Sequence, residues 1–391
     1  MKSGFIIIGL FMAISGAVAQ PADSVPAVDL VEVIIKKLHI NFHENKRAER
    51  KVHFSLFPTQ GGVSGGRAVV TSFNAAFNLG EASNTRVSSV YFIPYITFTG
   101  KYGFLIRNSI WLPRNAWNLS GDYRILKYPQ STWGLGGSSE GAISTEIDNS
   151  YFRFYQTALK GIGRNWNVGV GYMLDHHYNI EEITDGSEGF LNRYPTGNDR
   201  KTTSSGLFFP VAYDARGNSI NPQGGAYVLV GYRLNTPVMG SDHLWHSLYI
   251  DGRKYFSFSD YRQNILAFRS YYWTVLSGQV PYLDLPAIGW DLGIIPSGRG
   301  IEQGRYRSNA LLYVESEYRF DLTANGLFGG VVFSNVSSAS EFETQNFQTW
   351  HVAAGAGLRI KFNKYSRTNI LFDFAASKEY MAVYLNIGEA F

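Results

Sequence analysis

The segment from residue 297 to residue 320 constrains the fold more than any other part of the sequence. It begins as a loop rich in glycine and arginine and continues as a run in which carboxylates alternate with apolar residues. Successive side chains of a β-strand point to opposite faces, so Glu315, Glu317 and Arg319 share one face while the other face is apolar. A membrane barrel provides this pairing of environments, with water on one side of its wall and hydrocarbon on the other.

The composition also favours an exported barrel. The chain has 27 Phe, 25 Tyr and 41 Gly in 391 residues, yet beyond its first residues it has no run of about 18 apolar residues, the length that a membrane-spanning helix needs. A soluble β-sandwich or propeller is the alternative, but a soluble chain of this length should divide into domains. We find no linker-like change in composition and no repeat of fixed period. The net charge of +4 gives no reason to expect a nucleic-acid partner.

Residues 1 to 19 have the three regions of a secretory signal peptide. Lys2 supplies the positive start, residues 5 to 14 form a short apolar core, and Ala17-Val18-Ala19 is a small-residue cleavage site. The chain has no cysteine, so we expect neither a lipid-modified N-terminus nor disulfides.

Residues 20 to 50 have a different pattern. Leu30, Ile34 and Leu38 recur at helical spacing with charged residues opposite them, which predicts a short amphipathic helix in a periplasmic leader. The leader is too short to be a separate domain. We therefore expect the barrel itself to occupy residues 51 to 391.

Period-two alternation predicts sixteen strands in the barrel. The connections follow only in part the pattern of outer-membrane barrels, which have long external loops and short periplasmic turns. Long connections such as 179–203 and 277–308 follow odd-numbered strands, and several short ones follow even-numbered strands. The fold class is thus an all-β, 16-stranded antiparallel transmembrane β-barrel with a short N-terminal helix. The expected strands cover residues 51–58, 66–79, 86–98, 102–112, 117–127, 149–161, 165–178, 204–213, 224–235, 243–256, 262–276, 309–321, 326–334, 349–362, 367–377 and 380–391.

The last predicted strand closes with an aromatic residue. Val383, Leu385, Ile387 and Phe391 share one face, an ending that resembles the C-terminal signal of bacterial outer-membrane barrels. Glu389 stands where that signal usually has an aromatic residue. The ending Gly-Glu-Ala-Phe is nevertheless similar to that of one group of barrels.

That group is the bacterial surface antigen, or BamA/TamA, superfamily, which the chain resembles over most of its length. Gly298-Arg299-Gly300-Ile301 resembles the family's Arg-Gly-aromatic tip of a long external loop folded into the barrel, with Ile301 in place of the aromatic residue. Further resemblances are Asp214-Ala215-Arg216-Gly217-Asn218, Gly278-Gln279-Val280-Pro281 and Glu317-Tyr318-Arg319-Phe320. The resemblance implies a sixteen-stranded barrel that inserts proteins into the outer membrane or passes them through it.

The chemistry of the loop suggests how it is held. An arginine presents a rigid fork of donors that carboxylates accept in pairs, and alternation turns Glu315 and Glu317 inward. We expect Arg299 to pin the 277–308 loop by pairing with Glu317 first and Asp373 second. In the alternative, Arg299 is an ordinary solvated loop arginine.

The first predicted strand is short and ends at Pro58. It can share few backbone hydrogen bonds with strand sixteen, and each unpaired backbone group in lipid costs several kcal/mol. The sequence is compatible with a seam that opens sideways and equally with an ordinary closed barrel that has one short strand.

Signals for catalysis and metal binding are weak, and we expect no enzyme, cofactor or metal. Two segments, 62–66 and 137–141, match G-x-S-x-G, but neither lies between a buried strand and a helix. Asp175 and His177 share one strand face while His176 points away, too few ligands for a closed site. We expect a polar face on the inside of the barrel there.

The most consistent interpretation is an outer-membrane barrel that assists outer-membrane protein assembly or protein translocation. The relatives usually carry periplasmic polypeptide-binding domains, and this sequence shows none. We therefore expect outer-membrane lipid around the barrel, client outer-membrane proteins, and a separate periplasmic or lipoprotein partner. The alternative is a passive channel, or a structural barrel plugged by the 277–308 loop.

Overall fold

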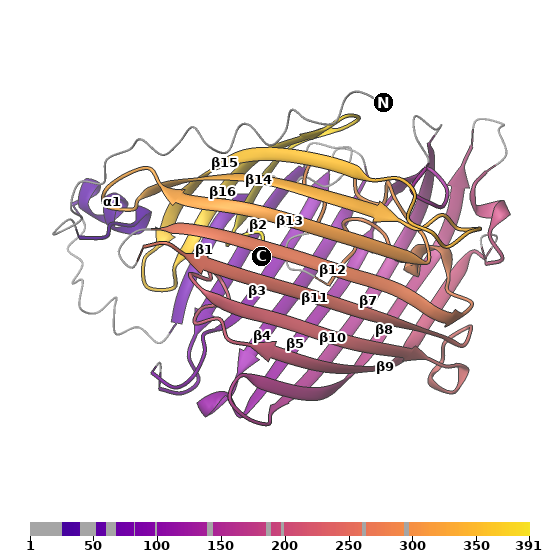
Figure 1. The fold of residues 1–391 in the computed structure, drawn as a ribbon, viewed down its shortest axis with the longest axis horizontal. Helices are drawn as coiled ribbons and strands as arrows, with labels where there is room; N and C mark the ends of the chain where they lie inside the picture. Colours follow the sequence, from indigo (N-terminus) through magenta and orange to yellow (C-terminus); the bar gives the residue numbers. More distant parts are fainter. Residues whose placement is uncertain are drawn as a thin grey trace.

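The computed structural model describes residues 26–39, 52–59, 68–81, 83–97, 100–138, 144–184, 189–196, 199–259, 263–292 and 297–391. In this part of the chain, seventeen antiparallel strands form one sheet that curls into a nearly closed barrel, with one short α-helix at its end (Figure 1). The predicted all-β barrel is therefore confirmed. The expected signal peptide, residues 1 to 19, lies outside the described residues.

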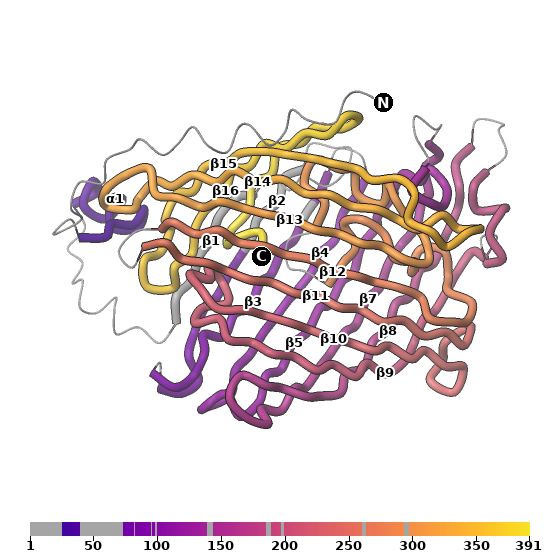
Figure 2. The backbone as a smooth tube through the Cα atoms, in the orientation of Figure 1, coloured from indigo at the N-terminus to yellow at the C-terminus, as the bar shows by residue number. Residues whose placement is uncertain are grey.

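The strands follow one another around the wall, and each one pairs with its neighbour in the chain apart from one interruption (Figure 2). Their bounds are β1 (Val52–Thr59), β2 (Ala68–Phe77), β3 (Ser88–Thr97), β4 (Tyr102–Trp111), β5 (Trp117–Lys127), β6 (Gln130–Thr132), β7 (Thr145–Gly161), β8 (Trp166–Ile183), β9 (Lys201–Asp214), β10 (Gly225–Asn235), β11 (Trp245–Ser257), β12 (Asn264–Gly278), β13 (Ala310–Asp321), β14 (Phe328–Ala339), β15 (His351–Asn363), β16 (Thr368–Ser377) and β17 (Met381–Ile387).

The interruption explains the difference between seventeen strands and the sixteen predicted. β5 and the three-residue β6 both pair with β7, so together they occupy one position in the wall, which leaves sixteen positions. Residues 128 to 148 lie between the strands predicted at 117–127 and 149–161. Part of this segment is β6, and β7 starts at Thr145 rather than at residue 149.

The strands form because their apolar residues alternate with polar ones, and the barrel turns the polar set inward. On β7, Arg153 is buried while its neighbour Phe154 is exposed, and on β16 Asp373 is buried between the exposed Phe372 and Phe374. A soluble sandwich would place these side chains the other way round. No helix in the described part of the chain is long and apolar enough to cross a membrane.

Strand length varies systematically around the barrel. β7 and β8 have 17 and 18 residues, whereas β1 and β17, which approach each other at the seam, have 8 and 7. At about 3.3 Å per residue, β17 is only roughly 23 Å long. Among the described residues, no ladder of paired residues joins β17 to β1.

The helix α1 (Leu30–Lys37) lies at the end of the barrel where the β13–β14 and β15–β16 turns meet (Figure 1). Asp29 caps it by accepting from the Glu32 amide at 2.9 Å and also accepts from the Lys364 amide at 2.9 Å. Lys364 Nζ lies 3.1 Å from Glu32. The predicted short helix is therefore confirmed, and it is attached to the short turns of the barrel.

Candidate functional site

The candidate site begins with two carboxylates on β13. Glu315 and Glu317 are buried, while Val314, which precedes Glu315 and points to the other face, is exposed. On β16, Asp373 is fully buried between the exposed Phe372 and Phe374. Three carboxylates from two strands thus converge inside the barrel.

Arg299 reaches all three of these carboxylates from the connection between β12 and β13. Its Nε donates to Glu315 Oε1 at 3.1 Å, its Nη1 donates to Asp373 Oδ2 at 2.5 Å, and its Nη2 donates to Glu317. The guanidinium carbon also lies 3.6 Å from the centre of the Phe333 ring. With only 2% of its surface exposed, Arg299 is a buried cation whose charge is compensated on several sides.

The backbone around Arg299 depends on its two glycines. Gly298 and Gly300 have φ angles of +80° and +84°, which residues with a side chain rarely adopt. A Cβ on Gly300 would also lie 2.9 Å from the Cβ of Ala353 and 3.0 Å from the backbone nitrogen of Ala376. Ile301 follows in a buried apolar cluster. The tip therefore packs directly against β15 and β16.

Two further hydrogen bonds hold the backbone of the tip. Asn335 Nδ2 donates to the Arg299 carbonyl at 2.9 Å, and the Gly300 amide donates to Tyr384 Oη at 2.9 Å. These partners lie on β14 and β17. The tip is thus bonded to four of the last five strands, including the strand at the seam.

The sequence analysis missed part of the charged network around Arg299. Arg359 donates to Asp373 at 2.5 Å and to Glu389 at 2.8 Å, and Arg319 donates to Glu317 at 2.7 Å. All of these side chains are buried. Alternation already placed Arg319 on the face of Glu315 and Glu317, and it could have indicated that Arg359 of β15 also faces inward. It does not indicate which carboxylates the two arginines meet.

The connection between β12 and β13, residues 279–309, also contacts the opposite wall. Asp284 accepts from Ser204 Oγ of β9 at 2.5 Å and lies 3.2 Å from His177 Nε2 of β8. Asp291 accepts from Arg269 of β12 at 2.6 Å. The 279–309 segment is therefore held by charged groups on both sides of the barrel.

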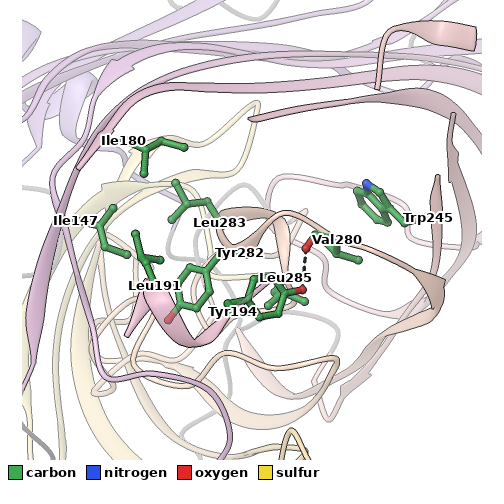
Figure 3. Close-up of a cluster of buried hydrophobic side chains, with 9 residues drawn as sticks. All are labelled: Ile147, Ile180, Leu191, Tyr194, Trp245, Val280, Tyr282, Leu283 and Leu285. Atoms are coloured by element: carbon green, nitrogen blue, oxygen red, sulfur yellow. Dashed lines mark hydrogen bonds between the residues drawn. The ribbon is translucent and has the colours of Figure 1, made fainter. Parts of the chain in front are cut away.

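An apolar cluster packs the first part of the 279–309 segment against the wall (Figure 3). Val280, Tyr282, Leu283 and Leu285 lie among residues of β7, β8, β11 and the β8–β9 connection. Tyr194 Oη donates to the Val280 carbonyl at 2.7 Å, the bond drawn in Figure 3. The cluster consists of Ile147, Ile180, Leu191, Tyr194, Trp245, Val280, Tyr282, Leu283 and Leu285.

A further ion pair lies at the end of the 279–309 segment. Arg305 Nη2 donates to Glu379 Oε2 at 3.0 Å in the β16–β17 connection. This hydrogen bond lowers the pKa of the Glu379 carboxyl below its ordinary value of 4.5. The carboxylate form of Glu379 is therefore favoured by the folded arrangement.

The residues considered for metal binding have other partners. Asp175 accepts from Arg153 at 3.0 Å and from Arg233 at 2.8 Å, and His177 stacks on Tyr151 with ring centres 4.3 Å apart. Within the described ranges, no three metal-ligating side chains gather at one point. The central serines of the two G-x-S-x-G matches, Ser64 and Ser139, lie outside the described residues.

The predicted C-terminal strand differs from the observed one. Val383 faces outward, with 42% of its surface exposed, but β17 ends at Ile387 instead of continuing to residue 391. Gly388 has a φ angle of +106°, so the chain turns there and Phe391 leaves the face that Val383 and Leu385 share. Glu389 and Phe391 are buried inside the barrel.

Part of the barrel interior is unfilled. A cavity of about 230 Å³ lies along β3 to β10. Its lining includes Arg107, Trp111 and Tyr155 from the wall and Leu292 from the 279–309 segment. The segment therefore borders an internal space on one side and is bonded to the wall near the seam on the other.

Comparison with known proteins identifies the type of barrel. The family profile described as Omp85 superfamily domain matches residues 66–391. None of the curated protein sequences matches the chain. Solved structures with the same fold include BamA from Haemophilus ducreyi lacking POTRA domains 1–3, with a TM-score of 0.54 and 12% identity over 92% of this chain and 78% of that one.

Two structures of CdiB are also similar. CdiB from Acinetobacter baumannii has a TM-score of 0.53 and 15% identity over 86% of this chain, and CdiB from Escherichia coli has a TM-score of 0.54 and 12% identity over 87%. This chain covers 60% and 62% of those two proteins. At these identities the likeness concerns the fold.

Proposed function

Because this chain belongs to the Omp85 superfamily, we propose that it is an outer-membrane barrel that assists outer-membrane protein assembly or protein translocation. In this proposal the 277–308 loop is folded into the lumen and restricts passage through it. The single observation that carries the proposal is the burial of Arg299 among Glu315, Glu317 and Asp373.

The energetics of that contact support a held loop. Burying a guanidinium costs several kcal/mol unless carboxylates and further hydrogen bonds compensate it. Here three carboxylates and the Phe333 ring surround Arg299, and its carbonyl accepts from Asn335. A loop tip with so many partners is expected where its position determines whether the barrel is open or closed.

The seam supports a role in moving polypeptide. β1 and β17 are less than half as long as β7 and β8, so fewer backbone hydrogen bonds must break to open the barrel there than elsewhere. An exposed strand edge can pair with an incoming strand through main-chain hydrogen bonds. This geometry suits a barrel that receives client strands from the membrane.

The proposed partners follow from the same role. Clients would be other outer-membrane barrels or exported polypeptides, delivered by a periplasmic or lipid-anchored protein. Co-purification from native membranes tests this part. A companion in a fixed ratio is expected, and isolation of the barrel alone under mild extraction would count against a delivered client.

Depletion of the protein in its native host tests the assembly role. We expect the amounts of several other outer-membrane barrels to fall, while an equal depletion of an unrelated barrel leaves them unchanged. A passive channel is the second candidate, favoured by the internal cavity of about 230 Å³. It predicts unchanged amounts of other barrels together with altered uptake of small solutes.

A further inference from the structure

The last four residues of the described chain are buried and do not form part of the barrel wall. After β17 ends at Ile387, the segment Gly388–Phe391 turns into the barrel instead of continuing the wall. The Gly388 amide donates to the Asn369 carbonyl at 2.8 Å. We call these four residues the inturned segment.

One half of the site that receives the inturned segment binds a carboxylate. Glu389 accepts from Arg359 Nε at 2.8 Å and from Asn369 Nδ2 at 2.6 Å. Among the described residues, these two donor groups have no other hydrogen-bond acceptor. Without Glu389 they would be left buried and unsatisfied, which costs about 1–3 kcal/mol for each group.

The other half of the site binds an aromatic ring. Phe391 packs with Tyr255, Ile265 and Ala267, and its ring centre lies 6.2 Å from that of Tyr255. The Arg319 guanidinium lies 5.2 Å from the centre of the Phe391 ring, and its Nη2 donates to the Phe391 carbonyl at 3.0 Å. An apolar floor beside a cation suits a planar aromatic side chain.

We propose that this is a peptide-binding site inside the barrel, occupied in this structure by the chain's own inturned segment. It recognises a carboxylate and, two residues later, an aromatic side chain. The site uses β11 to β13 for the ring and β15 to β16 for the carboxylate, so the elements that form it are separate from β17. An exchange of the inturned segment for a second peptide of the same chemistry would therefore leave the site intact.

Occupation by the inturned segment also bears on the seam. Gly388–Phe391 continues directly from β17, so its contacts with β11 to β13 fasten the seam strand to strands four to six positions away in the wall. The site shares Asp373 and Glu317 with Arg299, through Arg359 and Arg319. Release of the inturned segment would remove the contacts that tie the end of β17 to β11–β13, and it would take a carboxylate from the network that holds the loop tip.

A binding experiment on the full-length protein in detergent tests the site. The variant carrying Glu389→Ala and Phe391→Ala empties it, and heat-modifiable migration on gels checks that the barrel is intact. The probe is the peptide Gly-Glu-Ala-Phe with a fluorophore at its amino end. We expect the variant to bind it at least about tenfold more tightly than the unmodified protein, whose tethered segment competes at a high effective concentration.

Matched peptides determine what the site recognises. Replacing Glu by Gln, or Phe by Ala, in the peptide should weaken binding about tenfold or more. The peptide Gly-Phe-Ala-Glu, of the same composition, should not bind. Equal binding of all these peptides, or no binding of Gly-Glu-Ala-Phe by an intact variant, would overturn the proposal and reduce the contact to a structural one.

A second measurement does not depend on the folding of the double variant. The chain has no cysteine, so Ala390→Cys provides a single thiol at a buried position. Thiol labelling should be slow and should accelerate when excess Gly-Glu-Ala-Phe displaces the inturned segment, but not with Gly-Phe-Ala-Glu. Labelling unaffected by either peptide would contradict exchange at the site. Both measurements use purified protein, so their outcome is independent of the proposed role in assembly.

Discussion

Arginine suits position 299 because its planar fork can serve several carboxylates at once. Nε, Nη1 and Nη2 of Arg299 each have a different set of acceptors among Glu315, Glu317 and Asp373. A lysine has one compact charge and cannot reproduce this geometry. Position 299 therefore requires the shape of the arginine side chain as well as its charge.

Replacement of Arg299 by alanine should therefore loosen the segment. The change leaves buried carboxylates without their cation, at a cost of about 3–5 kcal/mol. We expect a lower unfolding temperature and faster proteolysis within residues 279–309, with Arg299→Lys in between. Arg164→Ala, in an exposed turn, is the control and should change neither property. A melting profile and proteolysis pattern identical to those of the control would count against the role of Arg299.

Gly300 offers an independent test of the tip. Gly300→Ala adds a Cβ at a φ of +84° and within 3.0 Å of β16, so strain and overlap should destabilise the tip by at least about 1 kcal/mol. The matched control is Gly217→Ala, where a Cβ would have open space. Limited proteolysis of both variants measures the effect, and an equal response of the two would show that the tip does not pack as described.

At the scale of elements, alternation is a strong guide to strands and a weak guide to their ends. β5 was expected at residues 117 to 127 and lies there, because polar and apolar residues alternate over most of its length. β17 ends early because Gly388 turns the chain and Glu389 finds Arg359, 30 residues away in the sequence. Contacts of this kind depend on which strands face each other, and period-two alternation contains no information about that.

The same limit applies to the candidate site. Sequence parity turned Glu315 and Glu317 inward, and it suggested Asp373 as a further carboxylate. It could not anticipate the second anchor, in which Asp284 meets His177 across 107 positions of the sequence. Nor could it place Arg319 and Arg359 in one network. The inward direction of a side chain is a local property, whereas its partner is set by the closure of the barrel.

The ion pair between Arg305 and Glu379 links the 279–309 segment to the β16–β17 connection, and it should be sensitive to pH. The pKa of Glu379 is lowered in the folded protein, so its stabilising contribution is complete above the unfolded value of about 4.5 and is lost as the pH falls through the folded value. Glu379→Gln should lower the free energy of unfolding at pH 7 by less than about 1 kcal/mol, which thermal unfolding measures. The difference should shrink below about pH 4.5. A difference that grows on acidification would contradict this assignment.

At the scale of the whole molecule, the barrel is polar inside and apolar outside. Its interior holds the charged side chains of β4 to β16, and a segment of the chain is bonded among them by Asp284, Asp291, Arg299 and Arg305. A barrel of about sixteen strands is wide enough to leave an aqueous channel when nothing obstructs it. We therefore propose that its permeability depends on whether the 279–309 segment stays in place.

Ion conductance in planar lipid bilayers tests this central claim most directly. We expect the unmodified protein to be mostly closed, Arg299→Ala to open more often, and a variant with residues 279–309 replaced by a short Gly-Ser linker to form a steady open pore. Arg164→Ala should behave as the unmodified protein. An unmodified protein that already conducts as strongly as the linker variant would show that the 279–309 segment does not close the barrel.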